Sequence, residues 1–471
     1  MLEEAIRPAV VLDDVEVREL EDELAGALIR PTDAEYDSAR QTWNARFNRR
    51  PALIVRPAGD EDVVRAVRFA KRNDLTLAIR GGAHSLAGLG VADDGLVLDM
   101  SGMRRITVDP AARVARVQAG ARWKDLEAVA GPLGLATPSG TCPTTGVAGV
   151  ALGGGVGWLT RHYGLSIDNL LGVDIVTADG VLRHASATEN PDLFWAVRGG
   201  GGNFGVVTML EMRLYPVTML YGGMIGWPMA QAGAVLRHFR EFAAAAPDEF
   251  GSIVMFMTAP PAPFVPPALH GQPVIAIAVA YSGDLAEGAR VVAPLRAFGA
   301  PAVDTLGPLP YAAMQAIGEP AGEMGVQHYI KSGYLDTLSD AAIDTIVAYA
   351  AALPGPMTAL HLNQIGGAMT RVPADATAFG RRTAQFIVNA MPTWVDPAQG
   401  AAHRAWADTF LAAMAPVLGD GVYVNFLDAE SPERVRAAYG ANWDRLRAVK
   451  RAYDPTNFFH QNQNIPPADE G

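Results

Sequence analysis

The chain has 471 residues, of which 49% are hydrophobic, and it carries 50 acidic against 38 basic residues. This length is too great for one ordinary domain and ample for two packed cores. The net charge of −12 makes nucleic acid and anionic membranes poor partners. Because the chain has a single cysteine, a disulfide framework and a zinc site built from several cysteines are excluded. No metal site is expected.

The sequence contains no signal that predicts export or membrane insertion. Residues 1–8 lack a basic segment followed by an apolar one, and they carry no twin-arginine motif. No run of 18 apolar residues predicts a transmembrane helix. We therefore expect a cytoplasmic protein. The frequent use of Ala, Arg and Gly suggests a bacterial source with GC-rich DNA.

The first third of the chain predicts alternating strands and helices after a helical lead-in that covers residues 1 to about 50. A helix is expected to begin near Asp60, a good N-cap, between strands at 51–55 and 75–79. This order predicts that the sheet begins with parallel strands. The buried stripe of the helix is expected to contain Val63, Val64, Val67 and Ala70. The next elements are strands at 96–99, 106–108 and 114–118 and a helix at 123–130.

A glycine-containing loop, Arg80-Gly-Gly-Ala-His-Ser-Leu-Ala-Gly88, follows the strand at 75–79. A compact loop of this kind presents several backbone N–H donors, and such nests bind phosphate. The loop lacks the Gly-Lys-Ser/Thr ending of a nucleotide P-loop, so that class of site is excluded. His84 taken alone is more often a structural histidine than a functional one.

The lone cysteine lies in a second glycine-rich stretch, from Gly140 to Gly157. Glycine lets the backbone approach a planar or charged ligand closely. The stretch therefore indicates either a large cofactor against the main chain with the Cys142 sulfur in reach, or a turn with an inert buried thiol. A Rossmann fingerprint is excluded at Gly153–Gly157, because the order of strand, glycines and helix is wrong.

The remaining elements divide into two groups. Strands at 171–177 and 206–214 follow the cysteine stretch, and the character of the chain changes near Tyr215-Pro216. From about 217 to 415, β-rich runs alternate with alanine-rich helices, and 260–267 is a proline-rich surface loop. The clearest elements of this part are strands at 251–257, 274–280 and 358–365 and a helix at 341–353. A last helix is expected at 435–452, before Asp454-Pro455.

Taken together, the two loops resemble the vanillyl-alcohol-oxidase (PCMH-type) family of flavoproteins, and most closely its berberine-bridge-enzyme-like branch. The motifs that carry the resemblance are Arg80–Ser85, Gly140–Gly146, Gly153–Gly157, Tyr163–Asn169, Asp192–Gly205 and Tyr453–Ile465. The resemblance implies an α+β, two-domain PCMH-type fold, whose substrate domain is an antiparallel sheet backed by helices. It places the FAD domain at 1–215, the substrate domain at 216–415, and a C-terminal segment that returns to the FAD domain at 416–471.

The same resemblance implies FAD attached at two points, through His84 to the 8α carbon and through Cys142 to C6. Attachment at two points would allow an open active site from which the cofactor cannot leave. The other residues that the resemblance places at the cofactor are Arg80, Gly81, Gly82, Ala83, Ser85, Gly140, Thr141, Thr145, Gly146, Gly149, Gly153, Gly154, Gly157, Asp168, Asn169, Gly205, Val206, Asn457 and Asn462.

Removal of a hydride from an alcohol or amine carbon leaves a proton that a base must accept. Tyr423-Val-Asn-Phe426 resembles the active-site strand of the family, so Tyr423 is the expected base and Asn425 is expected on the same face. A tyrosine has a pKa of about 10 and would need a nearby cation or donor to lower it. Relatives carry Glu or Gln near Gln364, where it lines the site, but a glutamine cannot serve as base.

Three functions are compatible with this sequence. The first is an FAD-linked oxidase that takes a hydride from a C–H next to O or N of a small molecule and passes the electrons to O₂, giving H₂O₂. The second is a dehydrogenase that uses another acceptor. In plant relatives the residue three after the cysteine gates oxygen, and Thr145 at this position favours the oxidase. The third is a noncatalytic flavin-binding protein. The substrate and the oligomeric state are not fixed by the sequence.

Overall fold

The computed structural model describes residues 12–469. Residues 1–11 of the expected helical lead-in lie outside this range. The described part of the lead-in is only partly helical: it comprises α1 (Asp14–Glu23), β1 (Ala27–Ile29) and α2 (Tyr36–Ala39). The expectation of a helical segment is wrong for β1, because this strand pairs antiparallel with β2 (Leu53–Arg56) and extends the first sheet.

The first sheet has the order β1-β2-β4-β3, and its last three strands are parallel, as the sequence predicts. Helix α3 (Asp60–Arg72) connects β2 to β3 (Leu77–Arg80), and β4 (Leu96–Asp99) lies between these strands. The N-cap of α3 is Gly59 rather than Asp60, which is the first helical residue. The loop after β3 therefore starts at the carboxyl edge of a parallel sheet, where ligands of such sheets bind.

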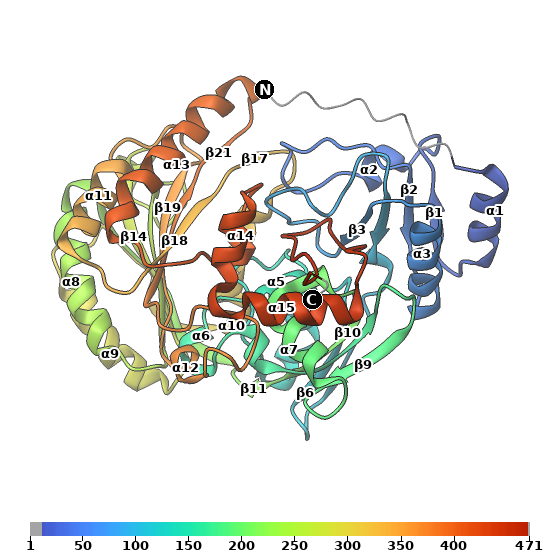
Figure 1. Ribbon diagram of the computed structural model, residues 1–471. Helices are drawn as coiled ribbons and strands as arrows, with labels where there is room; N and C mark the ends of the chain where they lie inside the picture. The colour runs from blue at the N-terminus through green and yellow to red at the C-terminus, as the bar shows by residue number, and fades with distance from the viewer. Residues whose placement is uncertain (1–11, 470–471) are drawn as a thin grey trace.

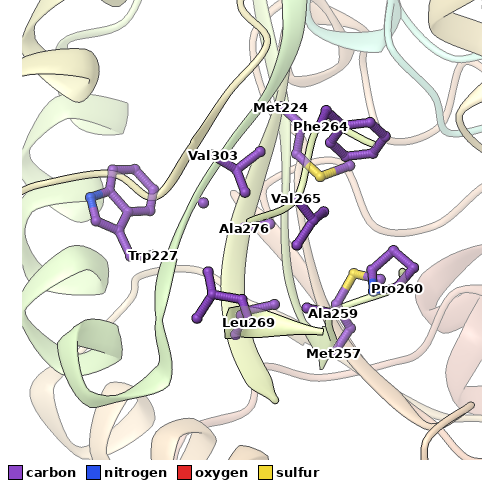
Figure 2. A pocket seen from close by; sticks show the side chains of 12 residues that line it. Met224, Trp227, Met257, Ala259, Pro260, Phe264, Val265, Leu269, Ala276 and Val303 are labelled. Carbon is purple, nitrogen blue, oxygen red and sulfur yellow. The ribbon is translucent and has the colours of Figure 1, made fainter. Parts of the chain in front are cut away.

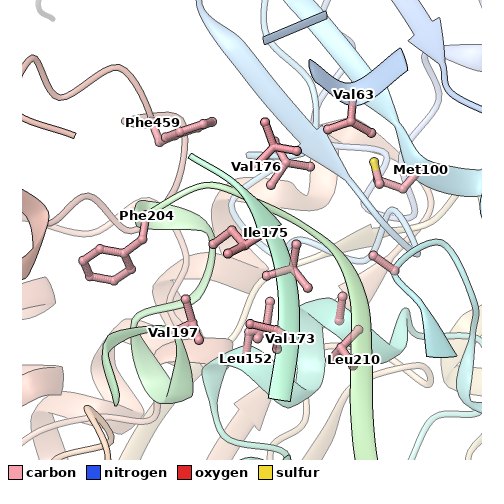
Figure 3. Packing of buried hydrophobic residues seen from close by; sticks show 14 of the residues in the cluster. Val63, Met100, Leu152, Val173, Ile175, Val176, Val197, Phe204, Leu210 and Phe459 are labelled. Atoms are coloured by element: carbon pink, nitrogen blue, oxygen red, sulfur yellow. The ribbon is translucent and has the colours of Figure 1, made fainter. Parts of the chain in front are cut away.

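A second, antiparallel sheet packs beside the first. Its strands, in spatial order, are β5 (Ile106–Asp109), β6 (Val114–Gln118), β10 (Val206–Arg213), β8 (Leu170–Val176) and β9 (Leu182–Ser186). Three helices accompany it, α4 (Trp123–Ala130), α5 (Val147–Gly153) and α7 (Pro191–Gly200). The apolar residues of both sheets and of these helices form one core, shown in Figure 3.

The largest sheet has eight strands, seven of them in the order β15-β12-β14-β13-β19-β20-β18, with β16 paired to β12. These strands are β12 (Met219–Pro228), β13 (Phe250–Thr258), β14 (Pro273–Tyr281), β15 (Val303–Asp304), β16 (Gly307–Pro310), β18 (Lys331–Leu335), β19 (Ala359–Gln364) and β20 (Phe386–Met391). All pairs are antiparallel. The outer face is covered by α8 (Ala232–Ala245), α9 (Leu285–Ala297), α11 (Asp340–Ala350) and α13 (Gly400–Met414), on the left of Figure 1.

Short elements connect the two halves. Strand β7 (Leu135–Ala136) pairs with β11 (Tyr215–Pro216), and β17 (Gln327–His328) pairs with β21 (Thr393–Trp394). The short helices are α6 (Thr160–Tyr163), α10 (Tyr311–Ala316) and α12 (Ala368–Arg371). The inner face of the large sheet, which α8 to α13 leave free, packs against Trp158 and Leu159 of the N-terminal half.

The C-terminal segment returns to the first core. The helix expected at 435–452 is divided into α14 (Pro432–Tyr439) and α15 (Trp443–Tyr453), because a 3₁₀ turn begins at Gly440, whose φ is +53°. Phe459 and Ile465 are buried in the same core as Val176 and Phe204 (Figure 3). The described residues contain no helix that is long and apolar enough to span a bilayer.

Candidate active site

The two loops that the sequence singles out touch each other through glycines. A Cβ atom on Gly82 would lie 2.2 Å from the Gly146 nitrogen, and one on Gly146 would lie 2.4 Å from the Gly82 nitrogen. No side chain fits at either position without movement of the backbone. Tertiary packing therefore brings the loop after β3 against the loop that precedes α5.

This contact places His84 and Cys142 around one hydroxyl group. The Oγ1 atom of Thr144 lies 3.1 Å from Nε2 of His84 and 3.2 Å from Sγ of Cys142. The ring of Trp43 stacks on His84 at 5.0 Å and on His328 at 3.7 Å. Burial, with a smaller effect of the Arg122 charge, lowers the pKa of His84 to about 4. His84 is therefore neutral at pH 7 and keeps a nucleophilic lone pair.

Backbone donors surround this group. The N–H groups of Gly82 through Ser85, and those of Gly140 through Cys142, donate no hydrogen bond to any described residue. Ala83 adopts a left-handed φ of +62°, and its carbonyl accepts from the Trp43 N–H at 3.0 Å. Consecutive unpaired N–H groups in a turned loop form an anion-binding nest. These donors fit an anionic group such as the pyrophosphate of FAD.

Other loop residues support the backbone rather than enlarge the nest. The Arg80 guanidinium donates to the Ala39 carbonyl, and the Ser85 hydroxyl accepts from the Leu89 N–H at 3.0 Å. The Thr145 hydroxyl donates to the Cys142 carbonyl at 2.7 Å. A Cβ atom on Gly81 would lie 3.5 Å from the Ala119 carbonyl oxygen, an ordinary contact, and the Thr141 carbonyl packs against Gly318 of the large-sheet half. The cysteine loop therefore lies between the two halves of the molecule.

The C-terminal segment brings Tyr423 to the glycine run. Residues 424–426 form a 3₁₀ turn, so the expectation of a strand at Tyr423–Phe426 is wrong. The Tyr423 phenolic oxygen accepts from the Gly155 N–H at 2.8 Å and from the Asn425 amide at 2.9 Å. Asn425 also donates to the Val150 carbonyl at 3.0 Å, which anchors the turn on α5.

Burial dominates the ionisation of Tyr423. Its side chain is 3% exposed, against the rings of Phe379 and Phe426. Burial raises the pKa of Tyr423 to about 12, although the donors on Gly155 and Asn425 oppose the rise. The donors that the sequence argument asked for are present, but they do not bring the pKa below the ordinary value of a tyrosine. The low dielectric of the site outweighs two hydrogen bonds, because desolvation disfavours the phenolate.

Several glycines of the run are required by packing of the protein on itself. A Cβ on Gly153 would lie 2.1 Å from Oδ1 of Asn425, and one on Gly154 would lie 2.7 Å from the Tyr423 ring. A Cβ on Gly157 would lie 2.2 Å from the Ser139 carbonyl. Gly149 is exposed with open space beside it, and Gly140 has ordinary contacts only. The glycines at these positions therefore leave the space that the C-terminal segment occupies at the site.

Five predicted site residues lie apart from this cluster. Gln364 lies on the helix-covered face of β19, where it accepts from the Ser252 hydroxyl at 2.8 Å. Asp168 forms a bidentate ion pair with Arg382 at 2.8 Å, and Asn169 is bonded to Tyr163, Leu165 and Tyr215. The Val206 side chain is buried in the core, and Gly205 packs on the Val176 carbonyl. The structure does not bring these groups to the loops.

The C-terminal asparagines keep free acceptors. Oδ1 atoms of Asn457 and Asn462 are buried without a hydrogen-bond partner among residues 12–469. The Asn462 amide donates to the Phe459 carbonyl at 3.0 Å, and Asn457 has a left-handed φ of +54°. Buried acceptors of this kind normally have a partner, so both side chains can receive a donor from a bound molecule.

Sequence reasoning missed Thr144, Trp43 and His328. Thr144 lies within the cysteine motif, so its closeness in sequence to Cys142 could have indicated a place in the site. Trp43 lies in the lead-in, and His328 in a two-residue strand, where no pattern marks either residue. The Nε2 atom of His328 is buried and has no hydrogen-bond partner among the described residues. Burial, with a smaller effect of the neighbouring His84, lowers the pKa of His328 to about 3. No cluster of three potential metal ligands occurs among the described residues.

A phosphate nest, a histidine and cysteine at one hydroxyl, and a buried phenol on a two-domain α+β fold define the class of FAD-linked oxidoreductases. Two family models match the chain, described as "FAD binding domain" at residues 51–186 and "Berberine and berberine like" at 422–466. The chain is 31% identical to an uncharacterised FAD-linked oxidoreductase, YgaK, of Bacillus subtilis, over 94% of its own length and 97% of the relative's. It belongs to the berberine-bridge-enzyme-like family of FAD-linked oxidoreductases.

Solved structures agree with this assignment. Crystalline 6-hydroxy-D-nicotine oxidase of Arthrobacter nicotinovorans superposes with a TM-score of 0.85 at 32% identity, covering 94% of this chain and 98% of that one. Xylooligosaccharide oxidase of Myceliophthora thermophila, bound to xylobiose, gives a TM-score of 0.84 at 25% identity and covers 97% and 100%. The fold expected from the sequence is confirmed.

Proposed function

We propose that this FAD-linked oxidoreductase is an oxidase with FAD bound covalently through His84 and Cys142. The observation that supports the attachment best is the Thr144 hydroxyl within 3.2 Å of both side chains. A neutral His84 and a half-buried thiol in one place supply the two nucleophiles that the two bonds need. The proposal also includes the division of the chain into an FAD domain, a substrate domain and a returning C-terminal segment, with boundaries at residues 215 and 415.

The reaction we propose converts R–CH₂–OH, or the corresponding amine, and O₂ into the carbonyl or imine and H₂O₂. When bound, FAD supplies the hydride acceptor and returns the electrons to O₂. Tyr423 accepts the substrate proton in its phenolate form, and the Gly155 and Asn425 donors stabilise the negative charge on its oxygen before the transfer. The walls of Phe379 and Phe426 exclude water from the phenol.

The choice of O₂ as acceptor rests on two observations. Both solved relatives described above are named oxidases, and Thr145 is smaller than the leucine that blocks oxygen in plant relatives. Anaerobically reduced holoprotein mixed with air-saturated buffer in a stopped-flow instrument should reoxidise rapidly with release of one H₂O₂ per flavin. Slow reoxidation by air together with rapid reoxidation by a quinone would favour the dehydrogenase instead.

Covalent attachment has a separate test that needs no substrate. Acid-precipitated wild-type protein should remain yellow and carry the mass of FAD. His84→Ala should keep FAD through Cys142, and the double variant His84→Ala/Cys142→Ala should release it. Thr145→Val, which changes the neighbouring side chain only, is the matched control and should retain the flavin. Release of flavin from the wild-type protein on precipitation would refute the proposal.

A further inference from the structure

The inner face of the large sheet is identified by the alternation of its side chains. On β13, Val254 and Phe256 pack under the outer helices, while Ile253 and Met255 face the N-terminal half. On β20, Val388 belongs to the helix-covered core, whereas Ile387 packs in a cluster with Tyr423. Since side chains alternate along a strand, every second residue of β13, β18, β19 and β20 faces the side of the site.

Four uncharged polar residues gather on this inner face next to Tyr423. Asn389 is paired across the strands with His361 on one side and Ser332 on the other, and Asn363 lies two residues from His361. Asn389 and Ser332 are each 1% exposed, yet the two amide atoms of Asn389, the Ser332 hydroxyl and Oδ1 of Asn363 have no hydrogen-bond partner among the described residues. Buried polar atoms without partners are costly, so a ligand is the expected partner.

The same cross-strand row becomes apolar in the other direction. His361 is paired with Met255, Met255 with Ala276, and Ala276 with Gly226. Beyond Met255 the row reaches a cavity of about 60 Å³ whose twelve lining residues are apolar, apart from the Trp227 indole N–H, which is bonded to Phe298. Figure 2 shows Val265, Leu269 and Val303 around this space, under the proline-rich loop between β13 and β14.

The polar end and the apolar end of this cross-strand row are separated by about the length of one small molecule. Neighbouring strands are about 4.8 Å apart, so Ala276 lies roughly 10 Å from His361 and roughly 14 Å from Asn389. We propose that this face, acting with the oxidase function proposed above, selects an uncharged amphiphilic substrate. Its head, which carries a hydroxyl group or an uncharged amine, bonds to Asn389, Ser332 and His361, and its apolar arm of about 10 Å reaches the cavity beneath Val265.

The chemistry of the row excludes two other substrate classes. A free sugar carries hydroxyl groups along its whole length, and those over Met255 and Ala276 would lose their water without gaining a partner. A charged head would meet no counter-charge on the side chains that bind it, since Asn389, Ser332 and Asn363 are neutral and burial lowers the pKa of His361 to about 4. The polar end adjoins Tyr423 through Ile387, which puts the reactive C–H on the head.

The test uses the FAD-loaded full chain and 4-alkoxybenzyl alcohols with alkyl chains from methyl to hexyl, against xylobiose. We expect kcat/KM to rise about fourfold per added methylene until the cavity is filled, because burial of one CH₂ contributes about 0.8 kcal/mol. Val265→Phe should abolish this dependence on chain length and leave the methyl probe unaffected. If Val265→Phe does not fold, Val303→Met in the same cavity takes its place.

A matched pair of serines separates recognition from folding. Ser332→Ala removes a buried, unpartnered hydroxyl, so it should lower kcat/KM about fivefold and raise the melting temperature of the substrate-free protein or leave it unchanged. Ser252→Ala, on the opposite face, leaves Oε1 of the buried Gln364 without its donor, so it should lower the melting temperature and leave kcat/KM unchanged. Equal kinetics in the two variants, with no gain from longer arms, would overturn the inference.

The outcomes also separate this inference from the oxidase proposal. Release of H₂O₂ from xylobiose without any response to the alkyl series would retain the oxidase and overturn the substrate class. Absence of H₂O₂ from every probe, with an arm-dependent change in the flavin spectrum that Ser332→Ala weakens, would overturn the oxidase and support the substrate class.

Discussion

Tyr423→Phe is the most informative change in this protein, because it removes one oxygen and keeps the ring between Phe379 and Phe426. The phenol has a pKa of about 12, so at pH 8 only about one molecule in 10⁴ carries the phenolate. If this group is the base, the rate of flavin reduction by substrate should rise about tenfold per pH unit over the accessible alkaline range. The variant should lose this slope.

The size of the effect follows from the contacts. Loss of an acid–base group costs about 10²–10⁴ in rate. The stability cost is limited, because Asn425 keeps its bond to the Val150 carbonyl, while the Gly155 N–H and one N–H of the Asn425 amide lose the phenolic acceptor. An unpaired buried donor costs about 1–3 kcal/mol. Tyr423→Phe should therefore fold and hold FAD.

Anaerobic rapid-reaction measurements over a range of pH decide the question. Tyr439→Phe, a change at another buried tyrosine of the C-terminal segment, is the matched control and should reduce at the wild-type rate. A loss of less than threefold in Tyr423→Phe, with the alkaline slope intact, would refute the assignment of the base. Collapse of flavin content in the variant would show a structural role instead.

Two further predictions concern stability. Burial raises the pKa of Glu127 from 4.5 to about 7, and its carboxyl accepts a hydrogen bond from Gln315 at 2.6 Å. Because the pKa is higher in the folded state, the contribution of Glu127 to the free energy of unfolding is complete below pH 4.5. About 3 kcal/mol of that free energy is lost as pH rises through 7. Glu127→Gln should therefore gain melting temperature over wild type as pH rises, and parallel pH profiles would contradict this. Lys450, which is fully buried, donates to Asp454, Asn203 and Phe459. Lys450→Met leaves the Asp454 charge unpaired and should cost about 3–5 kcal/mol; an unchanged thermal denaturation curve would show that the C-terminal segment docks without it.

Local patterns were sufficient where short-range chemistry fixes the backbone. The strands at 96–99 and 114–118 and the helix at 123–130 have the predicted bounds. The loop at Arg80–Ser85 was predicted as a phosphate nest from its glycines alone. Its N–H groups from Gly82 to Ser85 donate to no described residue, which leaves them available to a phosphate.

The sequence misled where a residue's role depends on a distant partner. Tyr423–Phe426 has the alternation of a strand, but it has no strand to pair with. It closes into a 3₁₀ turn that is held by Val150 and Gly155 instead. Gln364 is at the position where relatives carry Glu or Gln in the site, yet the register of β19 with β13 turns it toward Ser252 and the outer helices.

The sequence by itself determined the family, the two loops and the existence of two folded halves, because glycine placement and apolar spacing act over a few residues. Only the tertiary structure decided which groups meet. Thr144 lies between His84 and Cys142 because Gly82 and Gly146 allow two backbones to touch. The polar and apolar ends of the inner face arise from pairing of strands that are far apart in the chain. Such contacts depend on long-range packing, which no local spacing encodes.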